Sequence, residues 1–241
     1  MIFKIKFFFA TLISFFFKSK HNNMILMYHK IVSKNNDSIF DVYFNDFKNH
    51  VTFLLNYYNC QNLKNVLIKK NSFSITFDDG YDDIFFLILP FVEKNKLPIT
   101  VFITYDNINK KGYLTTDQLI KVSKSKYVNI GCHGYSHLSL DDYNSPFFNQ
   151  EITKSKMLIE KIIKKKIIFF SFPNGVFSNN SIQKVIESNY LMAFNSTSNT
   201  FDLSIPIDYF RIPRMCIYSC DNLRTIKLRL LGKFDWISKF T

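Results

Sequence analysis

The stretch SITFDDGYDD, residues 74–83, joins a β-branched and aromatic run to two adjacent carboxylates, Asp78 and Asp79, and then to Gly80. The apolar run predicts a buried strand, and the Asp-Asp-Gly sequence predicts a turn where that strand ends. In parallel α/β folds, binding and catalytic groups collect at the carboxyl ends of strands. The turn alone is more often structural. Two neighbouring acids repel each other, however, and a bound cation would relieve that repulsion.

Six further runs rich in Ile, Val, Phe and Tyr resemble this strand. Segments with helical periodicity separate most of them, at residues 46–57, 82–94, 116–123, 149–163 and 181–188. Alternation of strands and helices predicts an α/β fold with a mainly parallel sheet of about seven strands. The predicted strands are MILMYH from Met24, FSITF from Phe73, ITVFIT from Ile99, YVNIG from Tyr127, IIFFSF from Ile167, YLMAFN from Tyr190 and FRIPRMCI from Phe210.

The chain of 241 residues fits one domain, residues 24–241, preceded by a hydrophobic segment at residues 1–23. The eleven apolar residues 7–17 lie between lysines and fall short of the roughly 20 that a membrane span needs. An uncleaved signal, an interfacial anchor and a terminal helix packed on the domain all fit this pattern. We favour attachment to a membrane surface.

The formal net charge of +12 fits an anionic partner such as nucleic acid or a membrane surface. The sequence is rich in Lys, Asn, Ile, Phe and Tyr and has only two alanines, Ala10 and Ala193. A strongly AT-rich genome would produce this composition, and with it the positive charge, without selection for charge. Aromatic stacking patterns and nucleic-acid motifs are missing from the sequence, so we expect no nucleic acid partner. The four cysteines form no CxxC pair, which indicates reduced thiols.

A second candidate site is GCHGYSH, residues 131–137, where His133 and His137 are four residues apart and Gly131 and Gly134 bracket His133. On a helical turn this spacing would direct both imidazoles the same way. Two neutral imidazoles and one carboxylate can hold a divalent catalytic ion and leave room for water and substrate. A histidine pair alone is more often structural, but one of the two acids of the first motif could ligate the ion while the other removes a proton.

These motifs resemble those of the polysaccharide deacetylases with a NodB homology domain, carbohydrate esterase family four, over roughly residues 24–218. TFDDG resembles the first family motif, which implies that Asp78 is the general base and Asp79 a metal ligand. HGYSH resembles the second, which implies that His133 and His137 complete the ligand set. The resemblance also implies a distorted or incomplete (β/α) barrel.

The third family motif aligns with SFPNG, residues 171–175, and implies substrate contacts from Pro173 and from the backbone N–H of Asn174. Ser171 stands where many members carry arginine, and Asn174 where they carry an aromatic residue. Arg211 or Arg214 could replace the missing guanidinium beside Asp78, and we assign Arg214 to the substrate site.

No histidine follows His137, although many members supply the general acid from a later Leu-x-His motif. ILMYHKI, residues 25–31, resembles the opening of a subgroup in which a permuted first strand carries that histidine, which implies that His29 is the acid.

The resemblance implies metal-assisted removal of N-acetyl groups from amino sugars of a cell-envelope polysaccharide or glycolipid. Asp78 would act as base, a metal-bound water as nucleophile and His29 as acid. Zinc is the expected metal, and cobalt, nickel or iron would suit the same ligands. We expect a membrane-associated protein of the cell envelope, on either face.

Two alternatives come from other classes. The first is a glycan-binding module that has lost turnover because of Ser171 and Asn174. The second is a basic protein that binds a membrane surface or nucleic acid.

Overall fold

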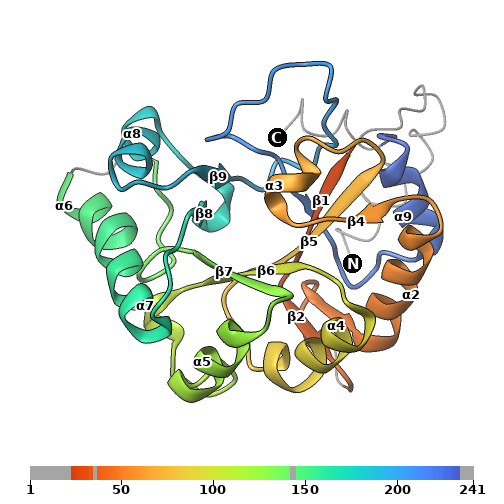
Figure 1. Ribbon diagram of the computed structural model, residues 1–241, viewed down its shortest axis with the longest axis horizontal. Coiled ribbons are helices and arrows are strands. Elements are labelled where there is room, and N and C mark those ends of the chain that lie inside the picture. The colour runs from red at the N-terminus through yellow and green to blue at the C-terminus, as the bar shows by residue number, and fades with distance from the viewer. Residues whose placement is uncertain (1–22, 35–36, 142–144, 234–241) are drawn as a thin grey trace.

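The computed structural model describes residues 23–34, 37–141 and 145–233. A curved parallel sheet in the order β10-β1-β5-β6-β7-β8-β9 forms its centre, and β4 pairs with the start of β5. Helices lie along the outer side of the sheet (Figure 1). The predicted single α/β domain with an incomplete barrel of about seven parallel strands is therefore confirmed. The hydrophobic segment predicted at residues 1–23 lies, except for Asn23, outside the described residues.

The predicted strands and helices are present with shifted bounds. The strands are β1 (Met24–Tyr28), β2 (Lys30–Val32), β3 (Asp41–Tyr43), β4 (Asn59–Cys60), β5 (Ser72–Phe77), β6 (Ile99–Ile103), β7 (Val128–Cys132), β8 (Phe169–Ser171), β9 (Met192–Phe194) and β10 (Met215–Cys216). The helices are α2 (Phe44–Leu55), α3 (Leu63–Val66), α4 (Leu89–Asn95), α5 (Thr116–Lys124), α6 (Ser145–Phe148), α7 (Ser155–Ile163), α8 (Asn179–Glu187) and α9 (Leu223–Leu230). None of the helices in the described ranges is both long enough and apolar enough to span a bilayer.

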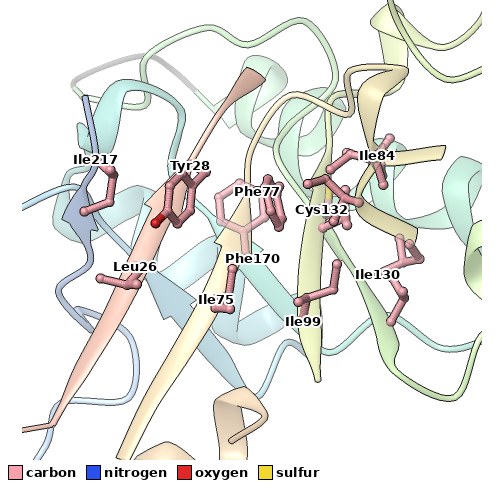
Figure 2. Packing of buried hydrophobic residues seen from close by; sticks show 14 of the residues in the cluster. Leu26, Tyr28, Ile75, Phe77, Ile84, Ile99, Ile130, Cys132, Phe170 and Ile217 are labelled. Carbon is pink, nitrogen blue, oxygen red and sulfur yellow. The ribbon is translucent and has the colours of Figure 1, made fainter. Parts of the chain in front are cut away.

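Strand alternation divides the buried residues into two layers. On β5, Phe73, Ile75 and Phe77 face the helices, whereas Ser74 and Thr76 face the inside of the barrel. Figure 2 shows the helix-side layer, in which Leu26, Tyr28, Ile75 and Phe77 project from neighbouring strands. Full burial of a side chain such as Phe77 contributes about 1.5–3 kcal/mol. The inner layer contains Ile25, Phe102, Phe169 and Phe194.

The segment from Ile212 to Cys216 connects the two edges of the sheet. Ile212 bridges to Phe194 at the end of β9, and Met215 and Cys216 pair with Leu26 and Met27 of β1. The side chain of Arg214 lies between these contacts and packs inside the barrel, with its guanidinium carbon 5.0 Å from the centre of the Phe102 ring. The incomplete closure of the barrel thereby brings an arginine to the middle of its inner layer.

Candidate active site and metal centre

At the carboxyl ends of the strands, polar side chains from several strands occupy the inner layer. Asp78 follows Thr76 in the period-two pattern of β5, and its N–H donates to the Tyr28 carbonyl at 2.9 Å. By the same alternation His29 follows Met27, and His133 follows Gly131. These side chains line one cavity of about 350 Å³ together with Asp79, His137 and Arg214.

A left-handed turn separates the two neighbouring acids. Asp79 has φ +71° and Gly80 has φ +79°, and the Gly80 N–H donates to the Asp78 carbonyl at 2.9 Å. A left-handed non-glycine residue costs about 1–3 kcal/mol, a type of strain that clusters at functional sites. A Cβ on Gly80 would lie 3.0 Å from the Ile103 side chain, so the close approach also requires glycine. The turn gives the two carboxylates different neighbours.

Asp78 lies in a buried cluster with Arg214. Two hydrogen bonds of 2.7 Å join the guanidinium to the two carboxylate oxygens, and both side chains are at most 2% exposed. Arg214 also donates to the Ser171 hydroxyl at 2.7 Å, to the Thr76 hydroxyl at 3.1 Å and to the Asn195 carbonyl at 3.3 Å. Burial alone would raise the pKa of Asp78, but the charges of Arg214 and His133 hold that pKa well below its usual range.

Asp79 lies with the two histidines of the second motif. Its Oδ1 is 3.3 Å from His137 Nε2 and 3.7 Å from His133 Nε2. The two imidazole rings are 4.8 Å apart between their centres. The structure therefore brings together the three side chains that the sequence proposes as metal ligands.

The ligand atoms fit a divalent metal ion. Nitrogen and oxygen ligands at about 2.0–2.1 Å from a tetrahedral zinc ion lie roughly 3.3 Å apart. The distances from Asp79 Oδ1 to the imidazole nitrogens, 3.3 and 3.7 Å, are close to this value. Asp79 Oδ1 is buried and has no hydrogen-bond partner among the described residues, as expected of an atom that ligates a cation. Since the histidine nitrogens and the carboxylate oxygen are ligands that zinc prefers, these residues suit the ion.

The protonation of His133 also suits a ligand. Its Nδ1 is 2.8 Å from the Ser171 carbonyl, to which it donates, and this leaves Nε2 without a proton and directed toward Asp79. Burial lowers the pKa of His133, although Asp78 and Asp79 oppose that effect. Burial thus favours the neutral imidazole, the form that binds a metal.

Glu151 holds the loop that carries His137, a role for which the sequence gives no signal. Its carboxylate is 1% exposed and accepts hydrogen bonds from the N–H groups of Tyr135 and Ser136, each at 2.9 Å, and from the Ser136 hydroxyl at 2.6 Å. These contacts fix the backbone just before His137, whose φ is +66°. Glu151 lies in a π-helical turn, a feature frequent at functional sites.

The third motif forms a tight turn at the edge of the cavity. Pro173 is buried, whereas Asn174 is exposed with φ +56° and donates from its side chain to the Ser139 hydroxyl at 3.0 Å. A Cβ on Gly175 would lie 1.8 Å from the Ser196 hydroxyl, so only glycine fits there. The unusual Asn174 side chain therefore joins this turn to the loop that follows His137.

His29 and the two candidate arginines have distinct surroundings. His29 packs against Phe40, with 4.6 Å between ring centres and the rings tilted by 48°, and its Nδ1 is buried without a partner in the described part of the chain. Arg211 lies on the exposed surface, where it pairs with Asp208, and only Arg214 contacts Asp78. All five N–H groups of Arg214 donate to protein atoms. The assignment of Arg214 as a substrate contact stays a prediction.

Comparison with known proteins identifies the family of this chain. Residues 67–193 match the family model described as polysaccharide deacetylase. The protein YxkH of Bacillus subtilis, assigned by its name to the polysaccharide deacetylases, is 28% identical over 118 residues, which are 49% of this chain and 42% of YxkH. The alignment thus spans less than half of that relative.

Solved structures share the fold. A polysaccharide deacetylase from Bacillus cereus, BC0361, has a TM-score of 0.76 at 20% identity, and the alignment covers 87% of this chain and 69% of BC0361. The Streptococcus pyogenes deacetylase PplD, solved in complex with acetate, also has a TM-score of 0.76, at 17% identity over 87% of this chain and 98% of PplD.

Proposed function

The chain belongs to the polysaccharide deacetylase family, and we propose on this premise that it is a metal-dependent hydrolase that removes N-acetyl groups from amino sugars of an envelope glycan. The observation that carries the proposal is the convergence of Asp79, His133 and His137 beside the buried Asp78. His133 Nε2 is 3.5 Å from Asp78 Oδ2, so the proposed base and the proposed metal ligands share one wall of the cavity.

Asp78 is the proposed general base. Because Arg214 keeps its pKa well below the usual range, the carboxylate is ionised near neutral pH and can accept a proton. A low pKa also makes a carboxylate a weak base. A divalent ion held by Asp79, His133 and His137 would supply the Lewis acidity that polarises the acetyl carbonyl and makes water acidic enough for Asp78 to accept its proton.

The departing sugar nitrogen needs a proton, and His29 lines the same cavity. Burial lowers the pKa of His29, and the charges of Asp78 and Asp79 oppose this effect and favour the charged, proton-donating form. The backbone N–H of Asn174 is the proposed donor to the oxyanion, since Asn174 lies at the cavity edge. The family match begins at residue 67, so the role of His29 rests on its place in the cavity.

The test uses the full chain loaded with zinc and two variants. We expect wild type to release acetate from N-acetylglucosamine oligomers or peptidoglycan. His137→Ala should lose both bound metal and acetate release. His29→Gln should keep the metal and lose about 100- to 10,000-fold in turnover, the range for a missing general acid. Metal analysis by mass spectrometry and an acetate assay measure both quantities. Full metal content and activity in His137→Ala would refute the proposal.

A glycan-binding module without turnover is the second candidate, because Ser171 and Asn174 depart from the family pattern. The Ser171 hydroxyl accepts from Arg214 at 2.7 Å, so the Asp78 cluster retains a guanidinium despite the serine, which favours the enzyme. If metal-loaded protein binds acetylated glycans and releases no acetate from any of them, the binding module is correct.

A further inference from the structure

We propose that the amino-terminal end of the barrel, opposite the active site, is a docking surface for an anionic phospholipid membrane. In a parallel sheet the loops that precede the strands all lie at one end. Exposed lysines occupy the loops or helix ends before β5, β6, β7 and β8. They are Lys69, Lys70, Lys94, Lys96, Lys126 and residues 164–166, all lysine, and we call this set the lysine face.

The AT-rich composition explains the number of lysines but not their position. Lys94 lies in the last turn of α4, where the helix dipole favours a cation. Lys69, Lys70 and Lys126 lie in loops beyond the helix ends, where the dipole has little effect. At the other end, the turn from Asp78 to Asp83 carries four acids, of which Asp78 and Asp83 are buried and Asp78 is paired with Arg214. The exposed lysines at the amino-terminal end outnumber the acids there, so the domain would turn its lysine face toward an anionic surface.

Exposed apolar side chains accompany these lysines. Ile68 is 68% exposed beside Lys69, and Met157 is 64% exposed in a shallow depression with residues 164–166. Tyr57, at 62% exposure, lines a cavity of about 320 Å³ with Asn71 and Lys227 at the same end. Glu93, Glu187 and Asp202 are the exposed acids nearby, the half-buried Glu160 lines the depression beside Met157, and the lysines outnumber these four acids. Basic and apolar side chains together fit a lipid headgroup layer better than the regular phosphates of nucleic acid.

The chain before the described domain starts from this end too. The side chain of Asn23 donates to the carbonyls of Val66 and Lys69, both at 2.6 Å, and Met24 pairs with Phe73. The 22 residues before Asn23, with the apolar stretch 7–17, are therefore attached beside Lys69. The point where this part of the chain joins the domain thus lies next to the lysine face, which favours a membrane as its partner.

Docking by this face would set the distance between the active site and the membrane. The cavity is at the carboxyl ends of the strands, so at least one strand of five residues, about 17 Å, separates it from the membrane. This step rests on the proposed deacetylase function: the substrate would be a glycan that extends away from the bilayer, such as a polysaccharide or peptidoglycan strand. A sugar held at the headgroup layer by its lipid would not reach the cavity.

Vesicle binding tests the surface without requiring activity. The probes are vesicles of phosphatidylcholine alone or with about 30% phosphatidylglycerol, used with the full chain. We expect binding only to the anionic vesicles, and loss of binding when salt rises from about 50 to 500 mM. Lys69→Gln with Lys70→Gln should weaken binding about tenfold or more, because each basic residue near the surface contributes several-fold. The matched control, Lys110→Gln with Lys111→Gln at the opposite end, should stay within about twofold of wild type.

Hydrogen exchange on vesicle-bound protein locates the contact. Within the described residues, slower exchange should be confined to 64–70, 94–98, 124–127 and 161–167, with loops 78–83 and 133–139 unchanged. Protection of those active-site loops, or wild-type binding by the Lys69 and Lys70 variant, would overturn the proposal. So would tight, lysine-dependent binding of duplex DNA with no binding to vesicles. Failure of acetate release with intact vesicle binding would instead reject only the proposed function.

Discussion

Asp78 and Asp79 are adjacent in sequence but lie in different surroundings. Asp78 is 2% exposed and paired with Arg214, whereas the side chain of Asp79 is 13% exposed and lies beside two imidazoles. The left-handed φ of Asp79 produces the difference, because it turns the second carboxylate out of the strand pattern that directs the first into the barrel. The two carboxylates are therefore neighbours in sequence but have different contacts, and each can have a separate role.

Replacing Arg214 by glutamine should leave the Asp78 carboxylate buried without its charge partner. We expect the free energy of unfolding to fall by about 3–5 kcal/mol, the usual cost of breaking a buried pair. The pKa of Asp78 should rise, so the acidic limb of the activity profile should move to higher pH. Urea unfolding and a pH–rate profile measure both effects. Arg211→Gln, at an exposed pair, is the matched control and should change stability by less than about 1 kcal/mol. Equal stability of both variants would contradict this account.

The loop from β7 to α7 depends on a contact that no local pattern predicts. Glu151 comes from the π-helical turn Asn149–Lys154, 14 residues after His137, and holds the backbone of Tyr135 and Ser136. The Glu151 carboxylate thereby orients the loop that carries the proposed metal ligand His137. Residues that hydrogen-bond to metal ligands have the same effect in other metal sites.

Glu151→Ala should therefore reduce zinc affinity about 10- to 100-fold while the domain remains folded. Glu151→Gln should stay within about fivefold of wild type, because an amide oxygen can accept both N–H bonds and the amide nitrogen can donate to the Ser136 hydroxyl. Competition with a fluorescent zinc chelator measures the affinity, and circular dichroism checks folding. Wild-type affinity in a folded Glu151→Ala variant would show that this contact does not position His137.

Neutral buried histidines make the stability of the whole domain depend on pH. His50 is 1% exposed, with Nδ1 at 3.3 Å from the Tyr28 hydroxyl and Nε2 at 3.1 Å from the Asp221 carbonyl, a pattern that fits the neutral ring. Burial lowers the pKa of His50 below its usual range, and it has the same effect on His29 and His133. The network joins β1 and α2 to the chain that leads into α9.

Since these pKa values are lower in the folded state, the unfolded chain binds more protons once the pH falls below about 6.5. The free energy of unfolding should be at its full value above that pH and decrease as the pH falls toward the folded pKa values. His50→Gln keeps both hydrogen bonds without the titration and should flatten this decrease by up to about 1.4 kcal/mol per pH unit. Urea unfolding at several pH values in the presence of a chelator measures it, and identical slopes for both proteins would contradict the prediction.

Local periodicity was enough to predict much of this molecule. The runs at Met24, Phe73, Ile99 and Tyr127 became strands within one or two residues of their predicted bounds, because each is a buried run between clear turn or helix signals. Later strands are shorter: the run from Phe210 contains only the two-residue β10, since Pro213 has no N–H for the sheet. Short elements such as β2, β3 and α9 were missed because their patterns are too brief to detect.

The sequence by itself determined which side chains share the inner layer. Alternation along β1, β5 and β7 directs His29, Asp78 and His133 to the same face, and scarce glycines mark the turns around them. Only the tertiary structure decided that Arg214, rather than Arg211, pairs with Asp78 across 136 residues, and that Glu151 holds the His137 loop. Periodicity is a property of neighbours along the chain, whereas these contacts depend on the order of strands and on the segment that bridges β9 to β1.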